Sequence, residues 1–168
     1  TVNPVNDVPV LDSISDQETD EDITFTYDVS ASDVDGDDLS YSISIDGNGD
    51  ASIDGTDLTI IPDINYNGSI EATVTVTDGQ DIDSDTFILT VNPVNDAPVL
   101  DVIGDQEIDE DVVFEYNLTA TDVDGDDLSY TVSIDGNGDA SIDGTELTII
   151  PDINYNGSIE AIVTVTDG

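Results

Sequence analysis

The sequence repeats itself at a constant offset of 89 residues, and this repetition constrains the fold more than any other feature. Residues 1–79 and 90–168 align without a gap and are identical at 64 of 79 positions. Because a repeat is one structural unit copied along the chain, both copies should adopt the same fold. We therefore expect two domains in series, at 1–90 and 91–168, as a window cut from a longer tandem array.

Each copy has the alternation of apolar and polar residues that is typical of β-strands. Apolar side chains occupy every second position of 23–30 and of 39–45, so each strand has one apolar face. The segments 69–77 and 86–91 follow the same pattern, and Gly, Asn, Asp and Pro separate the segments. About seven short strands per copy are typical of an immunoglobulin-like antiparallel β-sandwich. The sequence therefore predicts an all-β fold with two tandem β-sandwiches.

The charge of the chain restricts its partners. Asp and Glu number 41, and Lys, Arg and His are absent. Without cations to contact phosphate, the chain should bind neither nucleic acid nor an anionic membrane, and no apolar run approaches the roughly 18 residues of a membrane span. No salt bridge can offset the repulsion between carboxylates, about 1 kcal/mol per pair at about 4 Å in water. We therefore expect a cation to be part of the working structure.

The composition also argues against an enzyme. His, Cys and Lys, which supply most general bases and nucleophiles, are absent. Carboxylate pairs can hydrolyse glycosidic bonds, but here they recur in the loops of both copies without the signature of a pocket. Carboxylates at close spacing in loops instead suit Ca²⁺, which takes about six to eight oxygen ligands in flexible geometry.

Four motifs, in order along the chain, resemble those of cadherin repeats. The segment 31–43 resembles the Asp-x-Asp loop, and 62–66 resembles the Asp-x-Glu motif. The segment 76–79 is similar to the cadherin segment that ends in Asp, and 94–98 is similar to the linker between successive repeats. The chain therefore resembles the cadherin-like tandem repeats of microbial surface proteins, and the resemblance implies a cadherin-like sandwich and Ca²⁺ as the cofactor.

The resemblance further implies a calcium site shared by the end of copy one, the linker and the start of copy two. On this sequence the shared site would comprise Glu21, Asp63, Asn65, Asn95, Asp96, Asp122, Asp124 and Asp167. Two half-sites would be Asn6, Asp7, Asp33, Asp35 and Asp78, facing a preceding repeat, and Glu110, Asp152 and Asn154, facing a following one. Asn65 stands where the family motif has Glu, and Pro93 where the linker usually begins with Asp, which points to fewer or more weakly held ions.

Simpler interpretations stay open for several motifs. The Asp-x-Asp loop also fits a solvated turn, and the linker also fits a Pro-stiffened connection without metal. The segments 46–50 and 135–139 have acids at alternate positions, but their Asn-Gly pairs favour a hairpin turn over a calcium loop. Asn67, Asn117 and Asn156 begin glycosylation sequons, and their modification is left open.

These observations predict a structural role. The chain would be a calcium-stiffened extender repeat of a long extracellular surface protein, an adhesin stalk or a filament, with adjacent repeats or neighbouring subunits of a fibre as partners. The alternative is a calcium-dependent module that binds glycans or other surface proteins, against which near-identical copies and the absence of Trp argue. Copy two has no counterpart of 80–90, so following residues or a neighbouring subunit would supply its last strand.

Overall fold

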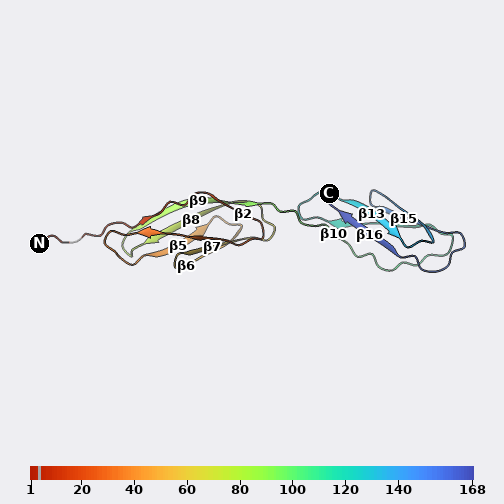
Figure 1. The fold of residues 1–168 in the computed structure, drawn as a ribbon, viewed down its shortest axis with the longest axis horizontal. Coiled ribbons are helices and arrows are strands. Elements are labelled where there is room, and N and C mark those ends of the chain that lie inside the picture. The colour runs from red at the N-terminus through yellow and green to blue at the C-terminus, as the bar shows by residue number, and fades with distance from the viewer. Residues whose placement is uncertain (4) are drawn as a thin grey trace. The chain divides into compact units, whose positions relative to one another are not determined.

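The computed structural model describes residues 1–3 and 5–168, which form two compact units, Thr1–Val94 and Asn95–Gly168 (Figure 1). All sixteen regular elements among the described residues are β-strands. The prediction of an all-β fold with two immunoglobulin- or cadherin-like repeats is therefore confirmed. The described residues contain no helix that is long and apolar enough to cross a membrane. The chain passes from the first unit to the second between Val94 and Asn95, whereas the sequence analysis placed the boundary after residue 90.

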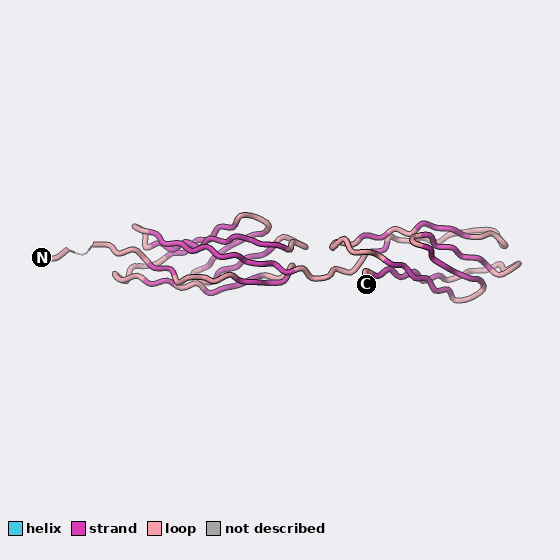
Figure 2. The backbone as a smooth tube through the Cα atoms, turned by 90° about the horizontal axis from the view of Figure 1, so that it is seen from above, coloured by secondary structure: helices cyan, strands magenta, loops and turns pink. Residues whose placement is uncertain are grey.

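Unit one is a sandwich of two sheets (Figure 2). Its strands are β1 (Val10–Leu11), β2 (Gln17–Asp20), β3 (Phe25–Asp28), β4 (Ala31–Ser32), β5 (Ser40–Ile45), β6 (Gly49–Asp54), β7 (Asp57–Pro62), β8 (Gly68–Thr77) and β9 (Ile82–Asn92). One sheet has the order β2-β9-β8-β5, the other has the order β3-β7-β6, and β1 pairs with β4. The strands pair antiparallel except for β2 and β9, which are parallel.

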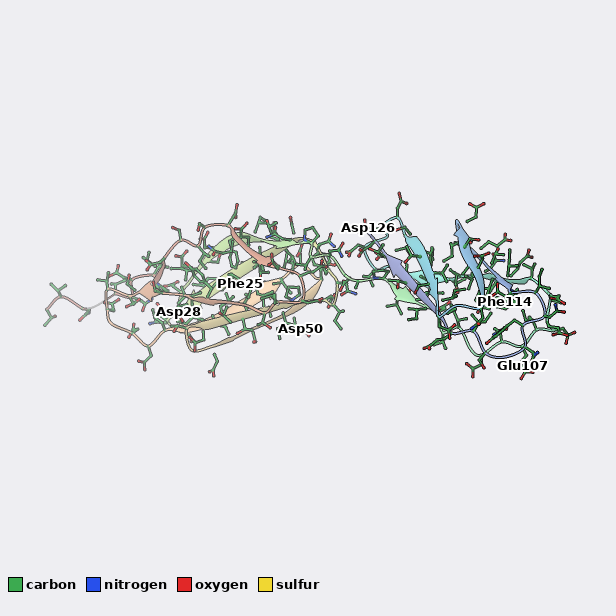
Figure 3. The ribbon with its side chains drawn as sticks, turned by 45° about the vertical axis from the view of Figure 1, so that its right-hand side comes forward. Phe25, Asp28, Asp50, Glu107, Phe114 and Asp126 are labelled. Carbon is green, nitrogen blue, oxygen red and sulfur yellow. The ribbon has the colours of Figure 1, made fainter. Side chains whose placement is uncertain are left out.

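The core of unit one lies between its two sheets. Ile70, Ala72, Val74 and Val76 of β8 are fully buried, while the alternate residues Glu71, Thr73 and Thr75 face outward, as the alternation predicts. Phe87 of β9 and Phe25 of β3 join the sheets, with ring centroids 6.3 Å apart (Figure 3 labels Phe25). Twelve apolar residues are buried in this core.

Strand β9 begins earlier than the sequence analysis expected. The alternation predicts a strand over residues 86–91, whereas β9 begins at Ile82. In the structure Asp83 and Asp85 continue the pairing with β8. Their carboxylates accept hydrogen bonds from the backbone N–H groups of Leu11 (2.9 Å) and Ile14 (2.7 Å). Acidic side chains can therefore occupy this strand because they bind the backbone of the segment between β1 and β2.

Unit two repeats this plan without counterparts of β2 and β9 among the described residues. Its strands are β10 (Val99–Leu100), β11 (Phe114–Asn117), β12 (Ala120–Thr121), β13 (Ser129–Ile134), β14 (Gly138–Asp143), β15 (Glu146–Pro151) and β16 (Ala161–Thr166). The sheet β11-β15-β14 is complete, but β16 pairs with β13 alone. Three apolar residues are buried in its core, Leu118, Leu147 and Ile149. The last strand of a repeat therefore determines how much of its core is covered.

Candidate metal centres

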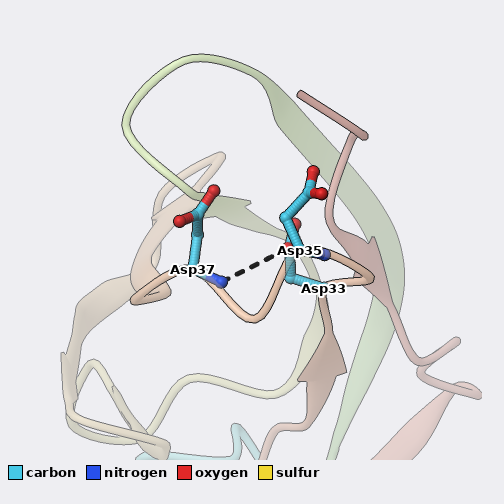
Figure 4. Close-up of side chains that lie close together, drawn as sticks. All are labelled: Asp33, Asp35 and Asp37. Carbon is cyan, nitrogen blue, oxygen red and sulfur yellow. Dashed lines mark hydrogen bonds between the residues drawn. The ribbon is translucent and has the colours of Figure 1, made fainter. Parts of the chain in front are cut away.

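The loop that follows β4 folds around the carboxylate of Asp33 (Figure 4). Asp33 Oδ1 accepts hydrogen bonds from the backbone N–H groups of Asp35 (2.8 Å), Gly36 (2.9 Å) and Asp37 (3.3 Å). Gly36 has a φ of 77°, which Gly adopts without strain. Carboxylate oxygens of Asp33, Asp35 and Asp37 thereby come within 4.8 Å of one another. Asp33 Oδ2 is buried and has no hydrogen-bond partner among the residues described.

Residues near the start of the chain join this loop. The side-chain amide of Asn6 donates to Asp78 Oδ2 (2.9 Å), and the backbone N–H of Asp7 donates to Asp35 Oδ2 (2.8 Å). The amide of Asn6 and the backbone N–H groups of Asp81 and Gln80 lower the pKa of the Asp78 carboxyl, because they stabilise its charged form. The five residues predicted for this half-site, Asn6, Asp7, Asp33, Asp35 and Asp78, therefore lie in one hydrogen-bonded group.

Unit two forms the same group from its own residues. Asn95 Nδ2 donates to Asp167 Oδ2 (2.8 Å), and the backbone N–H of Asp96 donates to Asp124 Oδ2 (2.7 Å). Asp122 Oδ1 accepts from the backbone N–H groups of Gly125 and Asp126, and Asp122 Oδ2 is buried without a hydrogen-bond partner in the described chain. Five of the eight residues predicted for the shared site, Asn95, Asp96, Asp122, Asp124 and Asp167, therefore lie together in unit two.

The other three residues of that predicted site, Glu21, Asp63 and Asn65, belong to unit one. Glu21 is 3% exposed, its backbone N–H donates to Asn92 O (2.9 Å), and its Oε1 accepts from the backbone N–H of Val94. Its Oε2 has no hydrogen-bond partner among the described residues. Glu21 Oε2 is therefore a buried carboxylate oxygen without a hydrogen-bond partner in the described residues, and it lies outside the Asp-rich loops.

The loop of Asp63 and Asn65 is held by a residue that the sequence analysis did not select. The backbone N–H of Asn65 donates to Asp22 Oδ1 (3.0 Å), and both residues have positive φ, 56° and 59°. In unit two Asp111 holds Asn154 in the same way at 2.8 Å. Asp22 and Asp111 are the third acids of the Asp-Glu-Asp triplets 20–22 and 109–111, whereas the sequence predicts the second acids, Glu21 and Glu110, as ligands.

Glu110 of unit two differs from Glu21 in its surroundings. The sequence predicts a half-site of Glu110, Asp152 and Asn154. Glu110 is exposed, and no described residue stands where Asn92 and Val94 stand in unit one. The backbone N–H of Asp152, which directly follows β15, donates to Asn137 O (3.0 Å) in the turn between β13 and β14. The structure therefore forms the loop of this half-site but leaves its Glu in solvent.

The segments 46–50 and 135–139 form turns, but not the hairpins that their Asn-Gly pairs predict, because they join strands of different sheets, β5 to β6 and β13 to β14. Asn48 and Asn137 have φ values of 60° and 63°, and each turn joins two strands of its unit. Asp46 Oδ1 accepts the backbone N–H of Glu71 (3.0 Å), so this carboxylate is used within the fold. The preference for the turn over a calcium loop agrees with this geometry.

The outer faces of the two sheets in unit one differ in charge. On β3, β7 and β6 the residues Asp28, Asp57 and Asp54 stand side by side, and the hydrogen bond with Asp28 and its negative charge raise the pKa of the Asp57 carboxyl (Figure 3 labels Asp28). The outer face of β5, β8 and β9 instead carries hydroxyl groups, on Ser40, Ser42, Ser44, Thr73, Thr75, Thr77, Ser84 and Thr86. The only residue without a hydroxyl in these three rows is Ile82, so this part of the face has no carboxylate.

Comparison with known proteins identifies relatives of the whole chain. A sequence profile described as "Bacterial Ig domain" matches residues 6–92 and 95–168. Chitinase A of Pseudoalteromonas piscicida is 30% identical over 149 residues, a match that covers 84% of this chain and 18% of the chitinase. Because the match leaves out most of the chitinase, its activity does not carry over to this chain.

Two solved structures of human protocadherin-24 EC1-2 share the fold. Their TM-scores are 0.54 and 0.50, and each is 14% identical to this chain. The matches cover 95% and 96% of this chain and 94% and 93% of those chains. Together with the family profile they confirm the predicted resemblance to cadherin-like and immunoglobulin-like tandem repeats.

Proposed function

The chain belongs to the bacterial Ig domain family, and from this premise we propose that it is a structural extender whose repeats are stiffened by Ca²⁺. It would form part of a long protein at the cell surface or outside the cell, such as an adhesin stalk or a filament. Two matches in series to one domain family support a spacer role, because repeated modules of one kind extend a chain without adding a new active site.

The observation that carries the proposal is the set of buried carboxylate oxygens without a hydrogen-bond partner in the described chain. Asp33 Oδ2 and Asp122 Oδ2 belong to loop carboxylates, and Glu21 Oε2 lies at the other end of unit one. A buried polar atom without a partner is unfavourable, and more so when it carries charge. A hard divalent cation would supply the missing positive charge and bind oxygen atoms of this type. The chain has no Lys, Arg or His that could do so.

The anchoring of the linker supports a stiffening role. Glu21 binds the backbone N–H of Val94, while Asp124 and Asp167 bind the next two residues, Asp96 and Asn95. One peptide bond, Val94–Asn95, therefore separates residues anchored by different units. Cations bound by Glu21 before this peptide bond and by the loop carboxylates after it would neutralise those carboxylates. They would also restrict rotation about the backbone bonds of Val94 and Asn95. Without them, motion between the domains is the default for small polar interfaces.

Calcium titration tests the proposal. We expect Ca²⁺ added after chelation to narrow the range of particle lengths that small-angle X-ray scattering measures, because the linker becomes stiffer. Ca²⁺ should also raise the melting temperature, because binding to the folded state stabilises it. Asp122→Asn removes the charge from a loop oxygen that lacks a partner, and should weaken binding about tenfold or more, or about 1.4 kcal/mol. Asp139→Asn on the outer face of β14 is the matched control and should bind Ca²⁺ like the parent chain. Unchanged scattering and melting in Ca²⁺ would refute the proposal.

A second candidate, a module that binds a neutral glycan, has one specific observation in its favour. The three rows of hydroxyl residues on the outer face of β5, β8 and β9 contain no carboxylate, in a chain with 41 acids. The match to part of a chitinase suggests chitin as the first glycan to test. Sedimentation with insoluble chitin measures binding. If this face binds, Thr75→Glu should abolish sedimentation and Ser52→Glu, on the outer face of β6, should not. Equal sedimentation of both variants would exclude this face.

A further inference from the structure

We propose that the last strand of a repeat, β9, and the Val94 that follows it build the cation site at that end of the repeat. Cation binding at Glu21 and docking of β9 would then be one linked equilibrium. This inference rests on the proposed function, because it assumes that the chain binds divalent cations. It adds that the site at Glu21 forms only when β9 is docked.

The contacts of Glu21 show how the site depends on β9. Its backbone N–H donates to Asn92 O at 2.9 Å, which continues the parallel pairing of β2 with β9. Its Oε1 accepts the backbone N–H of Val94. Glu21 is 3% exposed, and its Oε2 has no hydrogen-bond partner in the described residues. Both partners of Glu21 come from β9 or directly after it.

Unit two provides an internal control. Glu110 lies between the same neighbours as Glu21, Asp109 and Asp111 in place of Asp20 and Asp22. The hydrogen bond next to this Glu also forms in both units: in unit two the backbone N–H of Asn154 donates to Asp111 Oδ1 at 2.8 Å. Even so, Glu110 is exposed. The acidic triplet and the hydrogen bond between Asn154 and Asp111 are therefore not sufficient to bury this Glu, whereas the partners that accompany the burial of Glu21 are Asn92 and Val94.

The burial of Glu21 links the two events in both directions. Docking of β9 removes a carboxylate from water while one of its oxygens has no partner, which opposes docking in the absence of metal. A cation at Oε2 removes that penalty, so the docked state binds the cation more tightly than the undocked state. By linkage the cation must then favour docking by the same factor. Ca²⁺ would thus hold the closing strand of each repeat in place.

Hydrogen exchange measured by mass spectrometry tests this inference on the 168-residue chain, with Ca²⁺ and with a chelator. Glu21→Gln keeps the shape of the side chain and an acceptor for Val94 but removes the charge, and Glu110→Gln is the matched control. In the parent chain Ca²⁺ should slow exchange in Leu89–Val94 at least threefold. Glu21→Gln should lose this effect and keep the calcium effect in the loops 33–38 and 122–127, while Glu110→Gln should behave like the parent chain.

A second variant tests the inference by gain of function. A chain with residues 80–94 copied after Gly168 gives unit two its own last strand. In that chain Ca²⁺ should also protect the added strand, and Glu110→Gln should now abolish the protection. This arm does not depend on whether Glu21→Gln folds well.

The outcomes separate this inference from the proposed function. If Ca²⁺ protects the loops but Glu21→Gln leaves the calcium effect on β9 unchanged, the link to β9 is wrong and the extender proposal stands. If Ca²⁺ changes exchange nowhere in the parent chain, both are wrong.

Discussion

The two nearly identical repeats allow one core substitution to be made twice, in different surroundings. Ile70 of β8 is fully buried, and its neighbour in the sheet is Leu89 of β9. Its counterpart Ile159 is half-buried and precedes β16, which has no second neighbour among the described strands. Replacing a buried Ile by Ala removes its transfer free energy and leaves a cavity, at a cost of about 2–5 kcal/mol.

We therefore predict that the same substitution, Ile to Ala, costs more unfolding free energy in unit one than in unit two. Ile70→Ala should lower the free energy of unfolding of unit one by about 3–4 kcal/mol, because the side chain is fully buried. Ile159→Ala should lower that of unit two by about 1 kcal/mol, because part of the side chain is already in water and no closed cavity forms.

Urea unfolding followed by far-UV circular dichroism measures both costs, with each unit expected to unfold in its own transition. Each variant is compared with the parent chain in the same buffer, once with Ca²⁺ and once with chelator. This separates the stability lost through core packing from any stability gained by metal binding. The difference in midpoint multiplied by the slope gives the cost. Equal costs for the two variants, or a larger cost for Ile159→Ala, would refute the argument that β9 covers the core of unit one.

Three further predictions concern single contacts in unit one. Asp85→Ala leaves the backbone N–H of Ile14 without its acceptor and should cost about 1–3 kcal/mol in thermal unfolding. The pKa of Asp57 is raised above 3.8 by its hydrogen bond with Asp28, so the stability that this proton contributes is lost as pH rises through the folded-state pKa. Asp57→Asn should therefore raise the urea midpoint at neutral pH, with the gain shrinking below pH 3.8. Gly49→Ala would place a Cβ 2.5 Å from Ile61 O and should lower the melting temperature clearly, whereas the same substitution at the open turn residue Gly47 should act through its φ of 138° alone.

The sequence predicted most of the fold because repetition and alternation are local signals. The predicted strand 86–91 is shorter than β9, because Asp83 and Asp85 interrupt the apolar alternation of the sequence. Their carboxylates accept hydrogen bonds from backbone N–H groups about 70 positions away. The loop carboxylates were predicted from their spacing, and the structure groups them within each unit. Asp22 was missed because its role is to hold Asn65, which only the tertiary structure reveals.

The different surroundings of Glu21 and Glu110 could not be predicted from their neighbours in the sequence. Both lie in an Asp-Glu-Asp triplet that follows the same pattern. The burial of Glu21 comes from Asn92 and Val94, which are more than 70 positions away in the chain. A shared calcium site that combines Glu21, Asp63 and Asn65 with the residues of unit two stays a prediction.

The parallel pairing of β2 with β9 has a mechanical consequence. Gln17–Asp20 lies beside Leu89–Asn92, near the start and the end of unit one, and both strands run in the same direction (Figure 1). Tension applied to the two ends of the unit would pull these strands in opposite directions along their length. Their hydrogen bonds would then be loaded in shear, all at once, instead of breaking one after another as in a peeled hairpin. A chain of such units would resist stretching at the very strand that closes each core.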